Sequence, residues 1–409
     1  MSFRTWYRVI CLLAVGFASS ICVLNAPLAN AARTPSGGWV EGSAQQSVTV
    51  EDVQRILAED KGKSDAKVAR QLSGLELTER MRSAKLKSLE QSAPGMKSRR
   101  ALIALADASV FLRPAPADVL SQAPPDLDEQ RRMLSMTVGY LAKTLPKLPN
   151  FYATQTIVRF ERKPSGKRTK TVSRNHSSWR QVGSSTVVVA YRDGKDVVDP
   201  REWGEHPHHP EGEGLITKGT FGPILSVVFG DAAHGGGFTW EHWERGHAGA
   251  LAVFRYRVAK EHSHFSVGTY VSSDYNAAAL PVSGYHGEVA IDPATGTILR
   301  LAVQAEQPLS SLILQSDTMV EYGPVAIGGK TYTCPVRSVS MGDVGSMGVP
   351  GLFGEPTSAP DSPRLNDVTF DNYHQFRSES RILTGFVPAP DHERARHQDL
   401  CTTISAGNR

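Results

Sequence analysis

Residues 285–305, YHGEVAIDPATGTILRLAVQA, decide the fold because they hold two runs of alternating apolar residues joined by turn residues. A period of two is typical of a strand with one buried face, and Asp-Pro-Ala-Thr-Gly at 292–296 supplies the turn. The stretch predicts an antiparallel hairpin with one buried and one wet face. The predicted buried face comprises Tyr285, Gly287, Val289, Ile291, Leu299, Leu301, Val303 and Ala305. The predicted wet face comprises His286, Glu288, Asp292, Arg300, Gln304 and Glu306.

Strand patterns surround this hairpin over residues 151–160, 185–191 and 251–258, on both sides of Gly328-Gly329, and over 370–383. In 251–258 the residues Phe254, Tyr256 and Val258 alternate with arginines. Trp240 and Trp243 are three apart, which at strand geometry puts them on opposite faces. Only residues 221–232 interrupt the strands with a helical pattern. We therefore expect an antiparallel sheet over 149–385 and a C-terminal tail over 386–409.

Residues 341–366 are rich in Gly, Pro and Ser, and predict a long loop with the apolar tip Leu352-Phe353. Such a tip either covers a site as a flap or packs down as ordinary core.

Residues 49–148 have a helical period and predict an α-helical region. Each helix has one apolar stripe, so these helices must pack on one another or on the sheet. The clearest stripe comprises Leu134, Val138, Leu141 and Leu145. Predicted N-caps of earlier helices are Ser64, Thr78 and Ser98. Pro146, Pro149 and Asn150 mark the boundary with the sheet.

The N-terminus predicts export. Arg4 and Arg8 precede an apolar run over 9–24 and the small-residue motif Ala29-Asn30-Ala31, which is the order of a secretory signal peptide. We expect residues 1–31 to be removed and 32–48 to form a flexible leader, in a periplasmic or secreted protein. A retained anchor is the alternative, but the run is short and no later run is long enough to span a membrane.

Charge and cysteine content limit the partners. Loss of Arg4 and Arg8 lowers the net charge from +4 to +2, which gives no large field to attract nucleic acid. Cys11 and Cys22 leave with the signal peptide. Cys334 and Cys401 remain, and in an oxidising compartment they form either one disulfide or two unpaired thiols.

Catalytic and metal motifs fail on spacing. The histidines of His392-Glu-Arg-Ala-Arg-His397 are five apart, so they diverge on a helix and do not form a zinc protease motif. Neither a Gly-x-Ser-x-Gly elbow nor a Cys-x-x-Cys pair occurs, and we expect no enzyme activity and no cofactor. His262 and His264 would form half of a metal site if they shared a strand face. Weaker metal candidates, which read better as a solvated loop, are His206, His208 and His209.

The β-rich half resembles the periplasmic lipoprotein-carrier (LolA/LolB-like) superfamily. The resemblance rests on Phe151-Tyr152-Ala153-Thr154 at its start, on the short helix around Phe221-Gly222-Pro223-Ile224-Leu225 and on the hairpin over 287–298. It implies an incomplete antiparallel β-barrel, covered by helices, that holds acyl chains or other apolar ligands. This chain is longer than a carrier by its helical region, and as a whole it looks like large secreted bacterial proteins of unassigned function. No catalytic residue carries over.

The predicted fold class is therefore α+β, with an N-terminal helical region followed by a curved antiparallel sheet and a covering helix. The expected function is non-catalytic binding or carriage of an apolar small molecule or a lipoprotein. An envelope structural or interaction protein with a filled core is the alternative, and an unrecognised hydrolase the second alternative. The candidate cavity wall comprises Phe254, Tyr256, Tyr285, Val289, Ile291, Leu299, Leu301 and Val303. The candidate cover comprises Phe221, Ile224, Leu225, Val228, Leu352 and Phe353.

Overall fold

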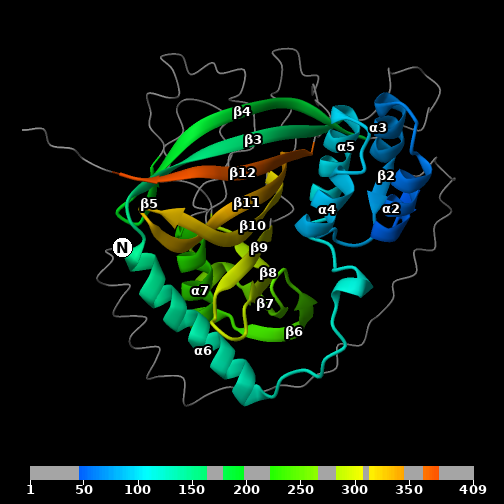
Figure 1. Ribbon diagram of the computed structural model, residues 1–409. Helices are drawn as coiled ribbons and strands as arrows, with labels where there is room; N and C mark the ends of the chain where they lie inside the picture. Colours follow the sequence, from blue (N-terminus) through cyan, green and yellow to red (C-terminus); the bar gives the residue numbers. More distant parts are fainter. Residues whose placement is uncertain are drawn as a thin grey trace, which may run out of the picture. The chain divides into compact units, whose positions relative to one another are not determined.

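The computed structural model describes residues 46–163, 178–197, 222–265, 282–306, 313–344 and 363–376. Figure 1 shows helices at the N-terminal end of the chain and a large sheet after them. The helical region contains α2 (Val50–Glu59), α3 (Asp65–Ser73), α4 (Ser83–Glu90), α5 (Met96–Asp107) and α6 (Leu127–Thr144). The sheet is interrupted by α7 (Pro223–Gly235).

The helical region also contains two short parallel strands, β1 (Gln46–Val48) and β2 (Leu75–Leu77). The expected flexible leader over 32–48 is thus wrong for its last three residues. The chain enters α2 through a capping box, in which Thr49 Oγ1 accepts from Asp52 N (3.1 Å) and Thr49 N donates to the Asp52 carboxylate (2.9 Å). The apolar stripes of the helices and strands before α6 form a core of their own.

The predicted N-cap of α3, Ser64, is confirmed by its position, whereas the other two predicted N-caps are wrong. Thr78 precedes α4 by several residues, and Ser98 lies inside the first turn of α5, whose N-cap is Gly95. The reason is a tertiary cap: the Asp65 carboxylate accepts from Ser98 N (2.8 Å) and Lys97 N (3.0 Å). A side chain from another helix therefore satisfies the free N–H groups at this helix start.

The large sheet is antiparallel and open. Its ten strands lie in the order β5-β4-β3-β12-β11-β10-β9-β8-β7-β6 (Figure 1). Along the chain, the first five strands of this sheet are β3 (Phe151–Lys163), β4 (Ser178–Arg192), β5 (Lys195–Val197), β6 (Phe238–Arg245) and β7 (Ala250–Val258). The next five are β8 (Gly284–Ile291), β9 (Ile298–Glu306), β10 (Ile313–Ile327), β11 (Lys330–Val344) and β12 (Arg364–Gln375). The predicted α+β class with a curved, unclosed antiparallel sheet is confirmed.

The predicted hairpin is β8 and β9. Asp292 holds its turn, because its carboxylate accepts from Ala294 N (2.9 Å) and Thr295 Oγ1 (2.8 Å). Gly296 has a φ of +72°, and a Cβ there would lie 2.6 Å from backbone atoms of α6. Only glycine therefore suits both this conformation and the close approach of the turn to the helix.

A bulge changes which residue of β9 enters the core. Ile291 pairs with Ile298, while Ala290 pairs with Arg300, so Leu299 is the extra residue between them. Ile298 is buried and Leu299 is half-buried. The placement of Leu299 on the buried face was wrong, because the sequence period of two does not reveal an inserted residue.

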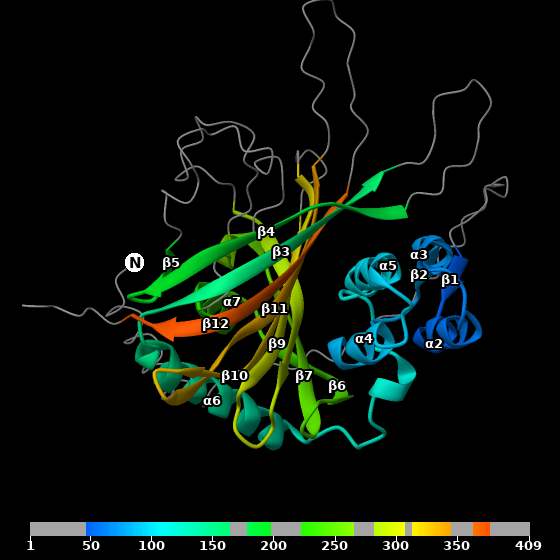
Figure 2. The same ribbon diagram turned by 45° about the horizontal axis from the view of Figure 1, so that its top comes forward.

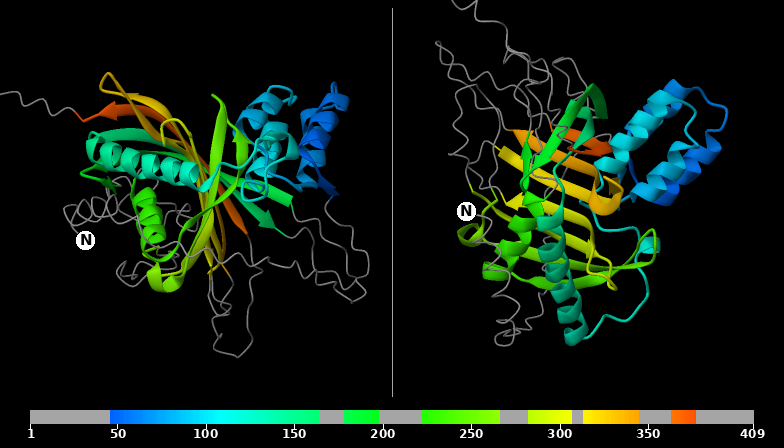
Figure 3. Two further views of the ribbon diagram at one scale, coloured as in Figure 1. Left: turned by 90° about the horizontal axis from the view of Figure 1, so that it is seen from below. Right: turned by 60° about the vertical axis from the view of Figure 1, so that its left-hand side comes forward.

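Helices α6 and α7 pack on one face of the sheet (Figure 3), with Leu141 of the predicted α6 stripe fully within that core. Leu134 and Val138 are partly buried at its border, while Met133 takes a central place. The opposite face packs on α5 through a smaller apolar cluster containing Ala104, Phe160 and Val339. The helical region and the sheet belong to one compact unit, which ends at Gln375.

Strands also begin and end differently from expectation near the predicted loop over 341–366. Strand β11 continues to Val344, and β12 begins at Arg364, earlier than the predicted residue 370. The loop tip, Leu352 and Phe353, lies outside the described residues. Among the described helices, none is both long and apolar enough to cross a membrane.

Candidate functional site

Seven of the eight predicted wall residues lie together in one core. The strand register explains this, because Phe254, Val289 and Leu301 form one row across β7, β8 and β9. Tyr256, Gly287 and Val303 form the next row. These seven side chains are at most 1% exposed: Phe254, Tyr256, Tyr285, Val289, Ile291, Leu301 and Val303.

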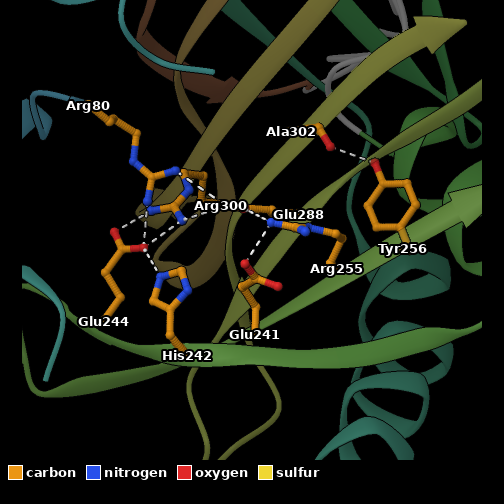
Figure 4. A network of polar contacts seen from close by, with 9 residues as sticks. All are labelled: Arg80, Glu241, His242, Glu244, Arg255, Tyr256, Glu288, Arg300 and Ala302. Atoms are coloured by element: carbon orange, nitrogen blue, oxygen red, sulfur yellow. Dashed lines mark hydrogen bonds and ion pairs between the residues drawn. The ribbon is translucent and has the colours of Figure 1, made fainter. Parts of the chain in front are cut away.

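Gly287 makes room for a hydrogen bond across the wall. The Tyr256 hydroxyl donates to Ala302 O at 2.6 Å, as Figure 4 shows. A Cβ on Gly287 would lie 1.9 Å from that carbonyl oxygen and 2.8 Å from the hydroxyl. Glycine at this position therefore leaves the space through which the phenol satisfies its polar end inside an apolar core.

Aromatic side chains extend the wall onto the edge strand β6. Phe238 lies 5.8 Å from Tyr256 between ring centroids, and Trp240 lies 5.5 Å from Phe254. Trp240 and Trp243 contact each other at 4.9 Å, so the expectation that they face opposite ways was wrong. A bulge between Trp240 and His242 adds one residue and brings both indoles to the same face.

Helix α7 covers this wall. The predicted cover residues Ile224, Leu225 and Val228 are all buried in the same core, together with Phe229. The remaining predicted cover residues, Phe221, Leu352 and Phe353, lie outside the described residues.

A single buried carboxylate ties α7 to the wall. Asp231 is 3% exposed, and it accepts hydrogen bonds from the Tyr285 hydroxyl (2.9 Å) and from His264 N (2.8 Å). The His264 ring nitrogen Nδ1 lies 2.6 Å from its other oxygen. Burial and the Asp231 charge raise the pKa of Tyr285, so the phenol remains a donor. We call Asp231, Tyr285 and His264 the latch.

Sequence reasoning missed the latch, although one signal pointed to it. Asp231 is the only charged residue in PILSVVFGDAAHG, apart from its histidine. A lone acid in an apolar helix needs a buried partner, because an unpaired buried charge is strongly unfavourable. Its partners, however, lie far away in the sequence.

A second polar group lies on the opposite face of the sheet, where Glu244 of β6 meets two arginines (Figure 4). Glu244 is 1% exposed and lies 2.6 Å from Arg80 Nη2 and 2.6 Å from Arg300 Nη1. Glu288 lies 3.4 Å from Arg80 Nη1. Burial would raise the pKa of Glu244, but Arg300, His242 and Arg80 hold it well below its ordinary value. We call these residues the Glu244 network.

The Glu244 network corrects the prediction of a wet face for the hairpin. Arg300 is 8% exposed, and Arg80, which precedes α4, covers it. A further ion pair joins Arg337 of β11 to Asp367 at 2.9 Å and also to Asp107 of α5. Buried ion pairs therefore join the helical region to this face, in addition to the apolar cluster on α5.

The predicted histidine and cysteine sites lie partly within and partly outside the described residues. His262 ends a short 3-10 helix and His264 belongs to the latch, so they do not share a strand face. His206, His208 and His209 lie outside the described residues, within which no group of three metal-ligating side chains occurs. Cys334 is a free buried thiol among the described residues, and its predicted disulfide partner, Cys401, lies outside them. Burial raises the pKa of Cys334 to about 12.

The arrangement thus consists of an apolar wall, a helix over it and a polar latch between the two. Its chemistry suits contact with apolar groups, because the side chains that face α7 are hydrocarbon or aromatic. No protein-family model matches the chain, and no curated protein matches it in sequence.

Proposed function

We propose that the chain is an exported, non-catalytic protein that binds an apolar ligand, a lipid or the acyl chain of a lipoprotein, against the wall beneath α7. The latch is the observation that carries this proposal. An apolar helix would pack on an apolar wall without any polar contact, whereas Asp231 gives α7 one defined closed position. Breaking those few bonds removes the polar contacts that hold α7 in this position.

The ends of α7 allow such a movement. Its N-cap is Gly222 and its last residue is Gly235, and two further glycines, Gly236 and Gly237, join it to β6. Glycine backbones absorb large changes of φ and ψ, as hinges require. When α7 moves, wall residues such as Phe254 and Val289 become the surface for an acyl chain. Export and the absence of a catalytic role rest on the signal pattern and the carrier resemblance.

The test compares two tyrosine substitutions in the same wall. Tyr285→Phe removes the phenol that donates to Asp231 on α7, while Tyr256→Phe removes one that donates to Ala302 O within the sheet. Each variant loses one buried hydrogen bond, which lowers the free energy of unfolding by about 1–2 kcal/mol. Only Tyr285→Phe removes a hydrogen bond between the wall and helix α7. We expect this variant to bind a fluorescent fatty acid faster than the wild type, with Tyr256→Phe unchanged, in stopped-flow titrations.

A filled-core envelope protein is the second candidate, and one observation favours it. The seven wall residues are already fully covered by side chains of α6 and α7. In that case neither tyrosine variant nor the wild type binds the probe, and both variants lose stability alone. Native mass spectrometry of the exported protein separates the two candidates further, because a carrier co-purifies with bound lipid.

A further inference from the structure

The outer strand β4 is long and only partly covered. It pairs with β3 from Ser178 to Tyr191, with one bulge at Val182. On its other side β5 pairs only with residues 190–192. Among the described residues, no strand pairs with the rest of this side (Figure 2). The opposite edge is different, because Leu120 N donates to Trp243 O of β6 at 2.9 Å.

The backbone of β4 presents hydrogen-bonding groups on this open side. Asp193-Gly194 forms a two-residue turn between Arg192 and Lys195, so Arg192 turns its N–H and C=O towards β5. In an antiparallel sheet the direction alternates from residue to residue. Ser184, Thr186 and Val188 therefore point their backbone groups outward. The side chains of these three residues are also exposed.

The sequence of this edge lacks the usual protection against strand pairing. Exposed edges generally carry lysine, proline or inward charges that prevent pairing with another strand. Residues 182–191, VGSSTVVVAY, contain no charged residue and no proline. The register between β3 and β4 shifts between Arg159 and Phe160, which makes Val182 the extra residue of a bulge. This bulge interrupts only the beginning of β4, before Gly183. The stretch from Gly183 to Val189 is therefore an uncharged strand edge.

We propose that this edge pairs with the same edge of a second copy, as an antiparallel β4-β4 seam about a twofold axis near Ser185 and Thr186. Two copies meet there without like-charge repulsion, since the edge carries no charge. The exposed residues also suit an isologous contact. With the axis at Thr186, Thr186 lies opposite itself and Ser184 lies opposite Val188. With the axis at Ser185, Ser184 lies opposite Thr186 and Val188 lies opposite Val182. The seam thus pairs small hydroxyl and valine side chains, which suit cross-strand contacts.

The test compares two lysine variants, one with the new charge at the seam and the other with the same charge on the neighbouring strand. Thr186→Lys brings two lysines together near the axis, whereas Thr156→Lys puts the same charge on β3, in the directly paired position. The two threonines lie on the same face, with their Oγ1 atoms 3.3 Å apart. We expect the purified wild-type chain to dimerise in sedimentation equilibrium. Thr186→Lys should weaken the dimer by at least about tenfold, while Thr156→Lys stays near the wild type.

A cysteine experiment locates the axis. Thr186→Cys forms an intermolecular disulfide if the axis runs through Thr186, and Ser185→Cys does so if it runs through Ser185. Formation of either bond supports the seam. A wild-type chain that is monomeric at every concentration overturns the proposal. So does a dimer that both lysine variants weaken equally, or that neither weakens, because its interface then lies elsewhere.

Discussion

Glu244→Gln tests whether the Glu244 network binds the helical region to the sheet. The change keeps the size and shape of the side chain but removes its charge. Arg80 and Arg300 then share only Glu288, which is 19% exposed and lies 3.4 Å and 3.9 Å from their nearest nitrogens. Two buried guanidinium groups are thereby left with incomplete neutralisation.

The expected loss follows from burial. Removing one partner of a buried ion pair lowers the free energy of unfolding by about 3–5 kcal/mol, because the remaining charge is neither solvated nor paired. Glu241→Gln is the matched control on the same strand. Glu241 pairs with Arg255 at 2.6 Å, but their side chains are 29% and 46% exposed. A surface pair of this kind contributes about 0–1 kcal/mol.

Urea unfolding followed by circular dichroism measures both variants. The pH dependence gives a second reading. Because the folded-state pKa of Glu244 lies below its ordinary 4.5, its contribution is fully present above that pH. It is lost as the pH falls through the lower folded-state value. Glu244→Gln should therefore lose less stability than the wild type on acidification below pH 4.5. Equal, small losses for both variants at neutral pH would refute the reasoning.

Two further predictions concern single residues. Cys334 should resist iodoacetamide at pH 8 in the folded protein, because it is 1% exposed and its pKa is raised to about 12, and it should react in urea without reductant. Protection that persists in urea would show that the thiol is bonded. Gly296→Ala should lower the unfolding free energy by at least about 1 kcal/mol, because φ is +72° and a Cβ meets the α6 backbone. Gly139→Ala, within α6 and with no atom within 4 Å of its Cβ, should instead raise it slightly, and calorimetry of both variants checks the sign.

Local patterns predicted what local interactions determine. The alternation on both sides of Asp292 identified the β8–β9 hairpin, because the turn and both strands lie within about twenty residues. The apolar pattern at Ile224 and Val228 likewise identified α7 as a helix. The wall could be predicted as a set because strand register follows once the turn is fixed.

Tertiary contacts account for what the patterns missed. A bulge is one extra residue, and neither Leu299 nor Trp243 carries a local sign of it. The start of α5 was displaced because Asp65, from another helix, caps it. The sequence pattern placed Arg300 on the solvent face, since an arginine on an alternating strand usually lies there. Its buried partner is Glu244 of β6, and Arg80, which also bonds Glu244, comes from a distant segment. Buried polar groups of this kind are specified by pairs of residues, which a single sequence does not display.

The place of β3 in the sheet sets an order for folding. Although β3 is the first strand of the sheet along the chain, it lies between β4 and β12, and Phe151 pairs with Gln375. During synthesis the hairpin of β3 and β4 keeps one open edge until the last strand, β12, leaves the ribosome. Helix α6 likewise lacks its packing surface at first, since the strands on which it packs are synthesised much later. Contacts between such distant segments slow folding. A chain truncated before Arg364 would leave β3 and β11 each with one open edge at the centre of the sheet, and open strand edges favour aggregation.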